Sequence, residues 1–332
     1  MPGVNTINAQ KKGKRFAFPL VVVVFILSGV LTGCQGNRYA QFGGYAQGGT
    51  WSVKANLKGV KERPREIQKH IDEILYEIDT TLSGYNKASQ LSRLNAGEIF
   101  EPSPMFQEVL DAAQHFYEET DGAVDCAAGA LFDIWGFGFR TDTLPSDAQI
   151  QAAMANKKVF NFNAIAQGYS ADKVAAYLYG IGVKDMLVDI GEIYCDGLNP
   201  QGKPWRIGID RPKDGNNMPG ADMQGILESD GGPQGIVTSG NYRKFFIKDG
   251  VKYSHTIDPR TGYPVQHNLL SATIIAPTAM QADAYATYCM VVGAEQAREF
   301  ILSRPDLEGY LINEGADSRF ESWASPGFKS VQ

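Results

Sequence analysis

Residues 253–264 read YSHTIDPRTGYP, with one histidine between two hydroxyl residues and a strong turn sequence after it. The residues just before it, 245–247 and then Asp249-Gly250, predict a strand that enters a hairpin whose second strand carries His255. The Asp-Pro step and the Thr-Gly pair predict a tight turn, because proline fixes φ and glycine accepts positive φ. A histidine at the end of a strand is well placed for proton transfer near neutral pH. The alternative is a solvent-exposed histidine on a hairpin, and this stretch alone favours neither.

Helical and strand patterns continue outward from this stretch without an internal repeat. Isoleucine and leucine at helical spacing between positions 67 and 82 predict an amphipathic helix, and Ser103 and Ser146 are good helix starts. Thr278 followed by Gln281 is a capping box and predicts a helix over 279–292. A further helix is predicted over 164–179, and strands over 186–190, 205–210, 235–237, 242–247, 252–257 and 272–275. Because no strict βαβ rhythm appears, we predict an α+β fold rather than a doubly wound sheet.

The N-terminus has the pattern of an export signal. Basic residues between positions 11 and 15 precede an almost continuously apolar run over 16–30, which ends in Leu-Thr-Gly-Cys at 31–34. This pattern predicts a signal peptide over 1–33. The ending resembles the bacterial lipobox, which implies cleavage before Cys34 and a diacylglycerol group on its sulfur. An uncleaved membrane anchor is the alternative, although the run is shorter than the roughly 20 residues that a spanning helix needs.

The residues after the lipobox indicate where the mature protein resides. Residues 34–48 are rich in glycine and glutamine and predict a lipidated tether, which leaves 49–332 as the folded domain. A lipid on Cys34 would hold that domain at a membrane surface without spanning the membrane. We therefore expect a protein of the bacterial cell envelope, lipid-anchored to a membrane with its domain outside the cytoplasm.

Charge and cysteine content argue against two classes of function. The net charge is −6 and no basic run occurs beyond the signal, so nucleic-acid binding has no electrostatic support. Cys126, Cys195 and Cys289 show no CxxC spacing, and their odd number indicates neither a zinc site nor a disulfide framework. We expect these three cysteines to be buried as small apolar residues.

Two patterns are candidates for binding a metal and a phosphate. Asp283 and Thr287 lie four positions apart on the helix predicted after Thr278, so they share one face and offer two oxygen ligands to Mg²⁺. From spacing alone, the favoured reading is an Asp near a helix start and a Thr bonded back to the helix backbone. Residues 161–169, NFNAIAQGY, predict a strand-to-helix turn that a phosphate can approach, or a turn of small residues packed for steric reasons alone.

Taken together, these segments resemble the ApbE family, the FAD:protein FMN transferases, in their order and spacing. The resemblance covers residues 49–293, nearly the whole predicted domain. The matching segments are SGYNKASQLSRLN (83–95), DCAAGALFDIWGFG (125–138), FNAIAQGYSADKVA (162–175), DIGEIYCDG (189–197), PWRIGIDRP (204–212), TSGNYRKFF (238–246), YSHTIDPRTGYPV (253–265) and ADAYAT (282–287).

The resemblance implies a fold, a reaction and a set of site residues. The fold is a bimodular α+β fold related to the tunnelling folds, with FAD in a cleft between two subdomains. The reaction is Mg²⁺-dependent transfer of FMN from FAD to a Ser or Thr hydroxyl of a target protein, with release of AMP. By position, His255 is the base, Asp283 and Thr287 are metal ligands through their side chains, and Ala164 is a metal ligand through its carbonyl. The flavin nucleotide contacts fall on Tyr85, Ala127, Ala128, Gly129, Asn161, Gln167 and Ile257.

The chemistry of the reaction agrees with these residue types. Breaking a pyrophosphate builds negative charge that a metal ion stabilises, and a base that activates the hydroxyl contributes roughly 10²–10⁴-fold in rate. The implied acceptors carry a Ser or Thr flavinylation motif and are subunits of membrane redox enzymes. Two alternatives use the same residues: a metal-dependent FAD pyrophosphatase that gives FMN and AMP, and a non-catalytic lipoprotein that binds FAD.

Overall fold

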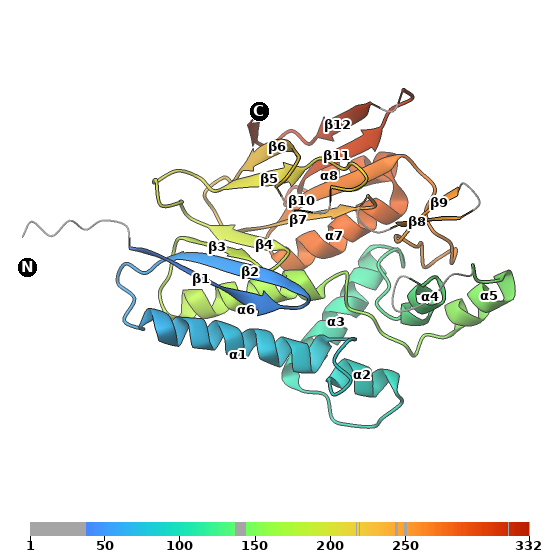
Figure 1. The fold of residues 1–332 in the computed structure, drawn as a ribbon, viewed down its shortest axis with the longest axis horizontal. Helices are drawn as coiled ribbons and strands as arrows, with labels where there is room; N and C mark the ends of the chain where they lie inside the picture. The colour runs from blue at the N-terminus through green and yellow to red at the C-terminus, as the bar shows by residue number, and fades with distance from the viewer. Residues whose placement is uncertain are drawn as a thin grey trace, which may run out of the picture. The chain divides into compact units, whose positions relative to one another are not determined.

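The structure, a computed structural model, is organised around an eight-stranded antiparallel sheet (Figure 1). It describes residues 38–136, 144–216, 218, 220–242, 245–248, 251–317 and 319–331. The order across the sheet is β1-β2-β3-β4-β7-β10-β11-β12. The bounds of these strands are β1 (Tyr39–Ala46), β2 (Gly49–Asn56), β3 (Met186–Asp189), β4 (Ile193–Asp196), β7 (Gln234–Gly240), β10 (Leu269–Ala276), β11 (Glu308–Glu314) and β12 (Phe320–Ala324).

Two smaller sheets complete the β structure. One has the order β13-β6-β5 and consists of β13 (Ser330–Val331), β6 (Met223–Glu228) and β5 (Arg206–Asp210). It packs through Trp205, Ile207 and Ile209 against Cys195 and Ile236 of the large sheet, and β5 confirms the strand predicted over 205–210. The other is the predicted hairpin, made of β8 (Phe245–Lys248) and β9 (Val251–Ser254). Because β9 ends at Ser254, His255 follows the strand instead of lying on it, which corrects the predicted strand over 252–257.

The helices pack on and beside the large sheet, and most begin where the sequence predicts. Ser103, Ser146 and Thr278 each accept a hydrogen bond from the backbone N–H three residues later, so the predicted caps are formed. The helix bounds are α1 (Pro64–Leu82), α2 (Gln90–Asn95), α3 (Pro104–Glu119), α4 (Gly129–Ile134), α5 (Asp147–Ala155), α6 (Ala166–Gly180), α7 (Ala279–Val292) and α8 (Ala294–Leu302). The predicted α+β class is confirmed, because helices and an antiparallel sheet share one folded unit.

The closest packing in the core joins α6, α7 and the sheet. A Cβ on Gly168 of α6 would lie 2.3 Å from the carbonyl oxygen of Ala279, the first residue of α7. A Cβ on Gly235 of β7 would lie 2.3 Å from the nitrogen of the same residue. Glycine is therefore required on both sides of Ala279, because any side chain would push α7 away from its neighbours.

The N-terminal boundary of the folded unit differs from the prediction. Residues 39–46, predicted as part of a tether over 34–48, form β1 and pair along their whole length with β2. Gly44, one of the glycines that suggested a flexible tether, is sterically required, since a Cβ on it would lie 2.7 Å from Nε1 of Trp51. Residues 34–37 of the predicted tether, which include Cys34, lie outside the described residues, as do the predicted signal peptide and the turn residues Asp249 and Gly250.

Across the described ranges, no helix combines the length and apolar character needed to cross a membrane. Cys126, Cys195 and Cys289 are buried and make no disulfide, as predicted.

Candidate functional site

A cavity of about 880 Å³ brings together most of the residues singled out from the sequence. Its wall is built from the segment after α1, the start of α4, the segment before α6, the end of β7, the residues after β9, and one face of α7. The predicted site residues in this wall are Tyr85, Gly129, Asn161, Ala164, His255, Ile257, Asp283 and Thr287. Residues separated by up to about 200 positions in the sequence thus face one space, which is large enough for a nucleotide-sized ligand.

Asp283 is the most deeply buried charged group of the cavity wall. Its side chain is 4% exposed, and Oδ2 accepts a hydrogen bond of 3.1 Å from the backbone N–H of Gly168. Burial raises the pKa of Asp283 well above its ordinary value, and the neighbouring carboxylate of Asp172 raises it further. The carboxylate is therefore electrostatically unfavourable unless a cation lies beside it.

The N-termini of α6 and α7 are capped by carboxylates that the two helices exchange. Asp172 of α6 accepts hydrogen bonds from the backbone N–H groups of Ala279 (2.8 Å) and Met280 (2.9 Å) in α7. Asp283 of α7 in turn accepts from Gly168 in the first turn of α6. Each carboxylate satisfies donors that a helix start leaves unpaired and also lies at the positive end of the helix dipole. Burial raises the pKa of Asp172 to about 6, although the two backbone hydrogen bonds act in the opposite direction.

The arrangement around Asp283 fits a hard cation. Thr287 follows Asp283 by one turn of α7, and Ala164 lies two residues before the start of α6. All three residues line the same cavity, and a carboxylate, a hydroxyl and a backbone carbonyl are the oxygen donors that they offer. Asp283 has no ion-pair partner within the part of the chain that the structure describes. The described residues also contain no cluster of three or more His, Cys, Asp or Glu side chains that could hold a metal by themselves. Mg²⁺ suits such a sparse donor set, because it completes its shell with water and substrate phosphate.

His255 is half-buried in the cavity wall and stands on a rigid support. The residues after it form the predicted turn, in which the backbone N–H of Gly262 donates to the carbonyl of Asp258 at 2.8 Å. Gly262 has a φ of +86°, so the positive φ expected of the Thr-Gly pair is present. Arg260 also forms an ion pair of 2.8 Å with the Asp258 carboxylate. The turn is thus held by its own backbone and side chains.

The same turn is anchored on α4 and α5. The indole Nε1 of Trp135 donates to the Gly262 carbonyl at 2.9 Å, and a Cβ on Gly262 would lie 2.6 Å from Ile150 and Met154. The hydroxyl of Tyr263 donates to Asp147 at 2.7 Å. These contacts fix the turn that follows His255, and Pro259 of this turn lines the cavity beside the histidine.

Three predicted nucleotide contacts, Ala127, Ala128 and Gln167, are not among the residues that line this cavity, and their contact with the nucleotide stays a prediction. Ala128 is buried and forms a β-bridge with Val159, and the backbone N–H of Ala127 donates to Asp125 at 2.8 Å. Of residues 127–129, only Gly129 therefore reaches the cavity. The Gln167 amide donates at 3.4 Å to the carbonyl of Ile190, which directs it toward the loop before β4.

Sequence reasoning missed several charged groups of the cavity wall, namely Lys87, Asp125, Asp133 and Glu192. Asp125 is 8% exposed and forms an ion pair with Lys157, and burial raises the pKa of Asp133 although Lys87 opposes this shift. All four groups lie in the segments that carry the family resemblance, but their spacing indicates no particular chemistry. With Asp283 they make the wall predominantly acidic, so an anionic ligand needs a compensating cation.

Comparisons with known proteins agree on one family. The model of the ApbE family matches residues 47–311. The FAD:protein FMN transferase of Escherichia coli strain K12 is 34% identical over 316 residues, which cover 86% of this chain and 87% of that protein. The FAD:protein FMN transferase of Vibrio cholerae is 33% identical over 325 residues, which cover 90% of this chain and 95% of that protein.

Solved structures show the same similarity. The flavin transferase ApbE from Vibrio cholerae has a TM-score of 0.75 at 32% identity and matches 87% of this chain and 98% of that chain. The apo flavinyl transferase ApbE of Pseudomonas stutzeri has a TM-score of 0.77 at 31% identity, with 87% and 95% covered.

Proposed function

The chain belongs to the ApbE family and is a flavin transferase, and from this premise we propose that it moves FMN from FAD to a Ser or Thr hydroxyl of a target protein in a Mg²⁺-dependent reaction that releases AMP. The observation that carries the detail of this proposal is the shared cavity. It contains the half-buried His255 and, on another element, the buried Asp283 with Thr287. A base and an oxygen donor set for a cation thus face one ligand space.

The proposed reaction is a substitution at the phosphorus of the FMN half of FAD. The acceptor oxygen forms a bond to this phosphorus, and the bond from phosphorus to the bridging oxygen breaks. The bridging oxygen leaves with AMP and keeps the electron pair, while His255 takes the proton of the acceptor hydroxyl. This proton transfer is needed because a neutral hydroxyl is a weak nucleophile, and a positioned base contributes roughly 10²–10⁴-fold in rate.

The acidic wall supports the need for a cation. FAD brings a doubly charged pyrophosphate into a cavity that already contains Asp125, Asp133, Glu192 and Asp283. Mg²⁺ bound at Asp283, Thr287 and the Ala164 carbonyl would supply the missing positive charge on the pyrophosphate oxygens. Lys87 is in the same wall and adds a positive charge near Asp133.

The location and the partners form part of the same proposal. The lipobox pattern ending at Cys34 supports a protein that is lipid-anchored in the bacterial cell envelope, with its flavin transferase domain outside the cytoplasm. Acceptors in that compartment would be membrane redox subunits that carry a Ser or Thr in a flavinylation motif.

A labelling experiment tests the reaction and separates it from hydrolysis. The full chain is incubated with FAD, Mg²⁺ and a protein that carries a Ser or Thr flavinylation motif, and intact mass and AMP are measured. We expect a mass gain equal to FMN on the acceptor and one AMP per label. AMP without a labelled acceptor would instead identify an FAD pyrophosphatase, and neither product would identify a protein that only binds FAD.

A matched pair of histidine variants tests the base. We expect His255→Ala to abolish transfer while FAD still binds, because the imidazole acts on the acceptor proton rather than on the nucleotide. His115→Ala is the control, since His115 lies on the exposed surface of α3, where it pairs with Glu119. Loss of FAD binding in His255→Ala, or retained transfer, would remove His255 from this role.

A further inference from the structure

We propose that one end of the domain, formed by Arg38, the loop 57–63 and the first turn of α1, rests on anionic lipid headgroups and holds the cavity away from the membrane. We call this surface the anchor end. The inference rests on the proposed lipid at Cys34, and it adds an orientation that this lipid alone does not impose.

The chain leaves the folded unit from a rigid point at the anchor end. The backbone N–H of Arg38 donates to Oδ1 of Asn56 at 3.1 Å, and its carbonyl accepts from the N–H of Leu57 at 2.7 Å. Asn56 is in turn held by Asp185, to which its amide donates at 2.9 Å. The start of β1 therefore cannot swing away from the loop that follows β2.

The tether between the proposed lipid and this point is short. Gln35, Gly36 and Asn37 are the only residues between Cys34 and Arg38. Fully extended, this segment spans at most about 14 Å, because each residue adds about 3.5 Å. The domain is thus confined close to the membrane, and the surface around Arg38 is the part that can reach the headgroups.

This surface carries exposed positive charge, although the protein as a whole is acidic. Lys58, Lys61 and Arg65 are exposed, as is Arg38, and none of the four has an ion-pair partner in the described part of the chain. The protein as a whole has a net charge of −6. A cation near an anionic membrane contributes about 1 kcal/mol, and the contribution decays within a Debye length.

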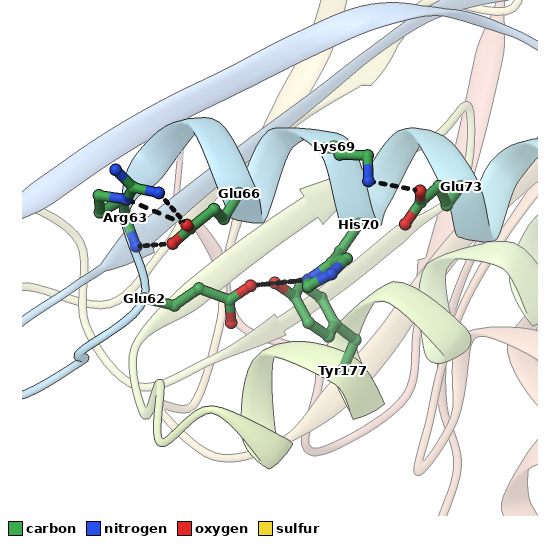
Figure 2. A network of polar contacts seen from close by, with 7 residues as sticks. All are labelled: Glu62, Arg63, Glu66, Lys69, His70, Glu73 and Tyr177. Carbon is green, nitrogen blue, oxygen red and sulfur yellow. Dashed lines mark hydrogen bonds and ion pairs between the residues drawn. The ribbon is translucent and has the colours of Figure 1, made fainter.

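The carboxylates of the same region are already engaged, as Figure 2 shows. Glu66 pairs with Arg63. Glu62 lies 2.6 Å from Nδ1 of His70 and accepts from the Tyr177 hydroxyl at 2.9 Å. These acidic groups face partners on α1 and α6, so the unpaired charge presented by the anchor end is positive. No large apolar side chain is exposed between residues 57 and 65, which favours a contact with headgroups over insertion among acyl chains.

Helix α1 connects this surface to the cavity. It starts at Pro64, within the anchor end, and runs for 19 residues to Leu82, next to α2 (Figure 1). Gly84 and Tyr85, which follow at once, line the cavity. At 1.5 Å per residue the helix spans about 28 Å. If α1 stands along the membrane normal in this orientation, the proposed acceptor hydroxyl belongs to a part of its protein that projects roughly 30 Å from the membrane, and a Ser or Thr at the membrane surface is out of reach.

Energy transfer in vesicles measures this orientation. A fluorophore is attached to the full-length lipidated protein at Gln201→Cys or Ile99→Cys, and the vesicles contain an acceptor on their headgroups. Gln201 is exposed in the loop whose Leu198 carbonyl accepts from the Tyr39 hydroxyl, and Ile99 is fully exposed beyond α2. The three cysteines at 126, 195 and 289 are buried and do not compete for the label.

Lipid composition and one neutralised lysine provide the tests of charge. In vesicles with phosphatidylglycerol we expect more energy transfer from a fluorophore at position 201 than from one at position 99. In vesicles of phosphatidylcholine alone we expect a smaller difference. Lys61→Gln should reduce the population ratio of the preferred orientation to the others about fivefold, because one cation at an anionic surface contributes about 1 kcal/mol. Lys158→Gln is the control, because Lys158 is also exposed and unpaired but precedes Val159 of the cavity wall. Both variants should label a soluble acceptor at the normal rate.

Each contrary result has a distinct meaning. Equal energy transfer from positions 201 and 99 in anionic vesicles overturns the proposed orientation. A difference between the two positions that neither phosphatidylcholine vesicles nor Lys61→Gln reduces overturns it as well. A preference lost only when an acidic protein is removed would show that the anchor end binds that protein instead of lipid. If the intact mass of the full-length protein includes no acyl chains, the anchor and the orientation are both refuted. Transfer of FMN to a soluble acceptor tests the flavin transferase activity separately.

Discussion

Replacement of Gly168 by alanine tests the contact between α6 and α7 that supports the proposed metal site. A Cβ at this position would lie 2.3 Å from the Ala279 oxygen and 2.5 Å from the Ala279 carbonyl carbon. Both atoms belong to the backbone of α7, so no side chain can rotate to make room. The two helices must separate by about 1 Å to restore an ordinary contact distance.

The size of the effect follows from this geometry. Overpacking of a core typically costs about 1–3 kcal/mol, and alanine in a helix recovers up to about 1 kcal/mol relative to glycine. We expect a net loss of about 2 kcal/mol, which lowers the melting temperature by roughly 3 °C in a chain of this size. The separation also stretches the 3.1 Å bond from Gly168 to Asp283, so the Mg²⁺ concentration for half-maximal transfer should rise several-fold.

Gly180→Ala is the matched control, because it lies at the other end of α6 and a Cβ there meets nothing within 4 Å. It should be neutral or slightly stabilising. Thermal unfolding with and without Mg²⁺, followed by transfer rates across a Mg²⁺ titration, measures both consequences. If Gly168→Ala unfolds at the wild-type temperature and responds to Mg²⁺ like the wild type, the contact does not position the site.

Three further predictions concern the cap of α7, the turn and the pH dependence of stability. Asp172→Ala leaves the N–H groups of Ala279 and Met280 without their acceptor, so we expect urea unfolding to show a loss of about 1 kcal/mol in the free energy of unfolding. We also expect transfer to require more Mg²⁺, with the rate at saturating Mg²⁺ little changed. An unaltered Mg²⁺ response would show that the cap contributes to stability alone. Gly262→Ala should lower the rate of FMN transfer more than Gly202→Ala does. Both glycines have positive φ, but only a Cβ on Gly262 meets other atoms. Equal rates in the two variants would exclude a role for the turn in holding His255. Burial lowers the pKa of His267, whose Nε2 lies 2.9 Å from the Met290 carbonyl. Folding thus favours the neutral form of the imidazole. Its contribution to the free energy of unfolding is complete above the ordinary pKa of about 6.5, and stability should fall as the pH drops below that value. His267→Gln should reduce the difference in unfolding free energy between pH 7 and pH 5, and the same difference as in the wild type would contradict this assignment.

Local signals account for what the sequence predicted correctly. The caps at Ser103, Ser146 and Thr278 depend on residues three positions apart, and the turn at 258–262 depends on one Pro and one Gly. Such patterns can be read directly, because the atoms that bond are close in the chain. The alternation over residues 205–210 is local in the same way.

The β1–β2 hairpin shows why composition misled at the N-terminal boundary. Gly43 and Gly44 look like tether residues, yet Gly44 pairs with Trp51 and leaves room for its indole. β2 then pairs with β3, more than 130 residues later. Among the described strands β1 pairs only with β2, which follows it directly in the chain. The contact that fixes this hairpin in the large sheet is the one from β2 to β3, and no window of the sequence around residues 39–46 contains β3.

The sequence by itself determined the fold class, the helix that carries Asp283 and Thr287 on one face, and the turn beside His255. It also determined the family, through the order of its segments. Only the tertiary structure decided that Asp172 caps α7 while Asp283 caps α6, because each bond joins residues more than 100 positions apart. The tertiary structure also places Ala127 and Ala128 outside the set of residues that line the cavity. Spacing along one element follows from local helix geometry, whereas contacts between elements depend on how closely their backbones pack, as Gly168 and Ala279 show.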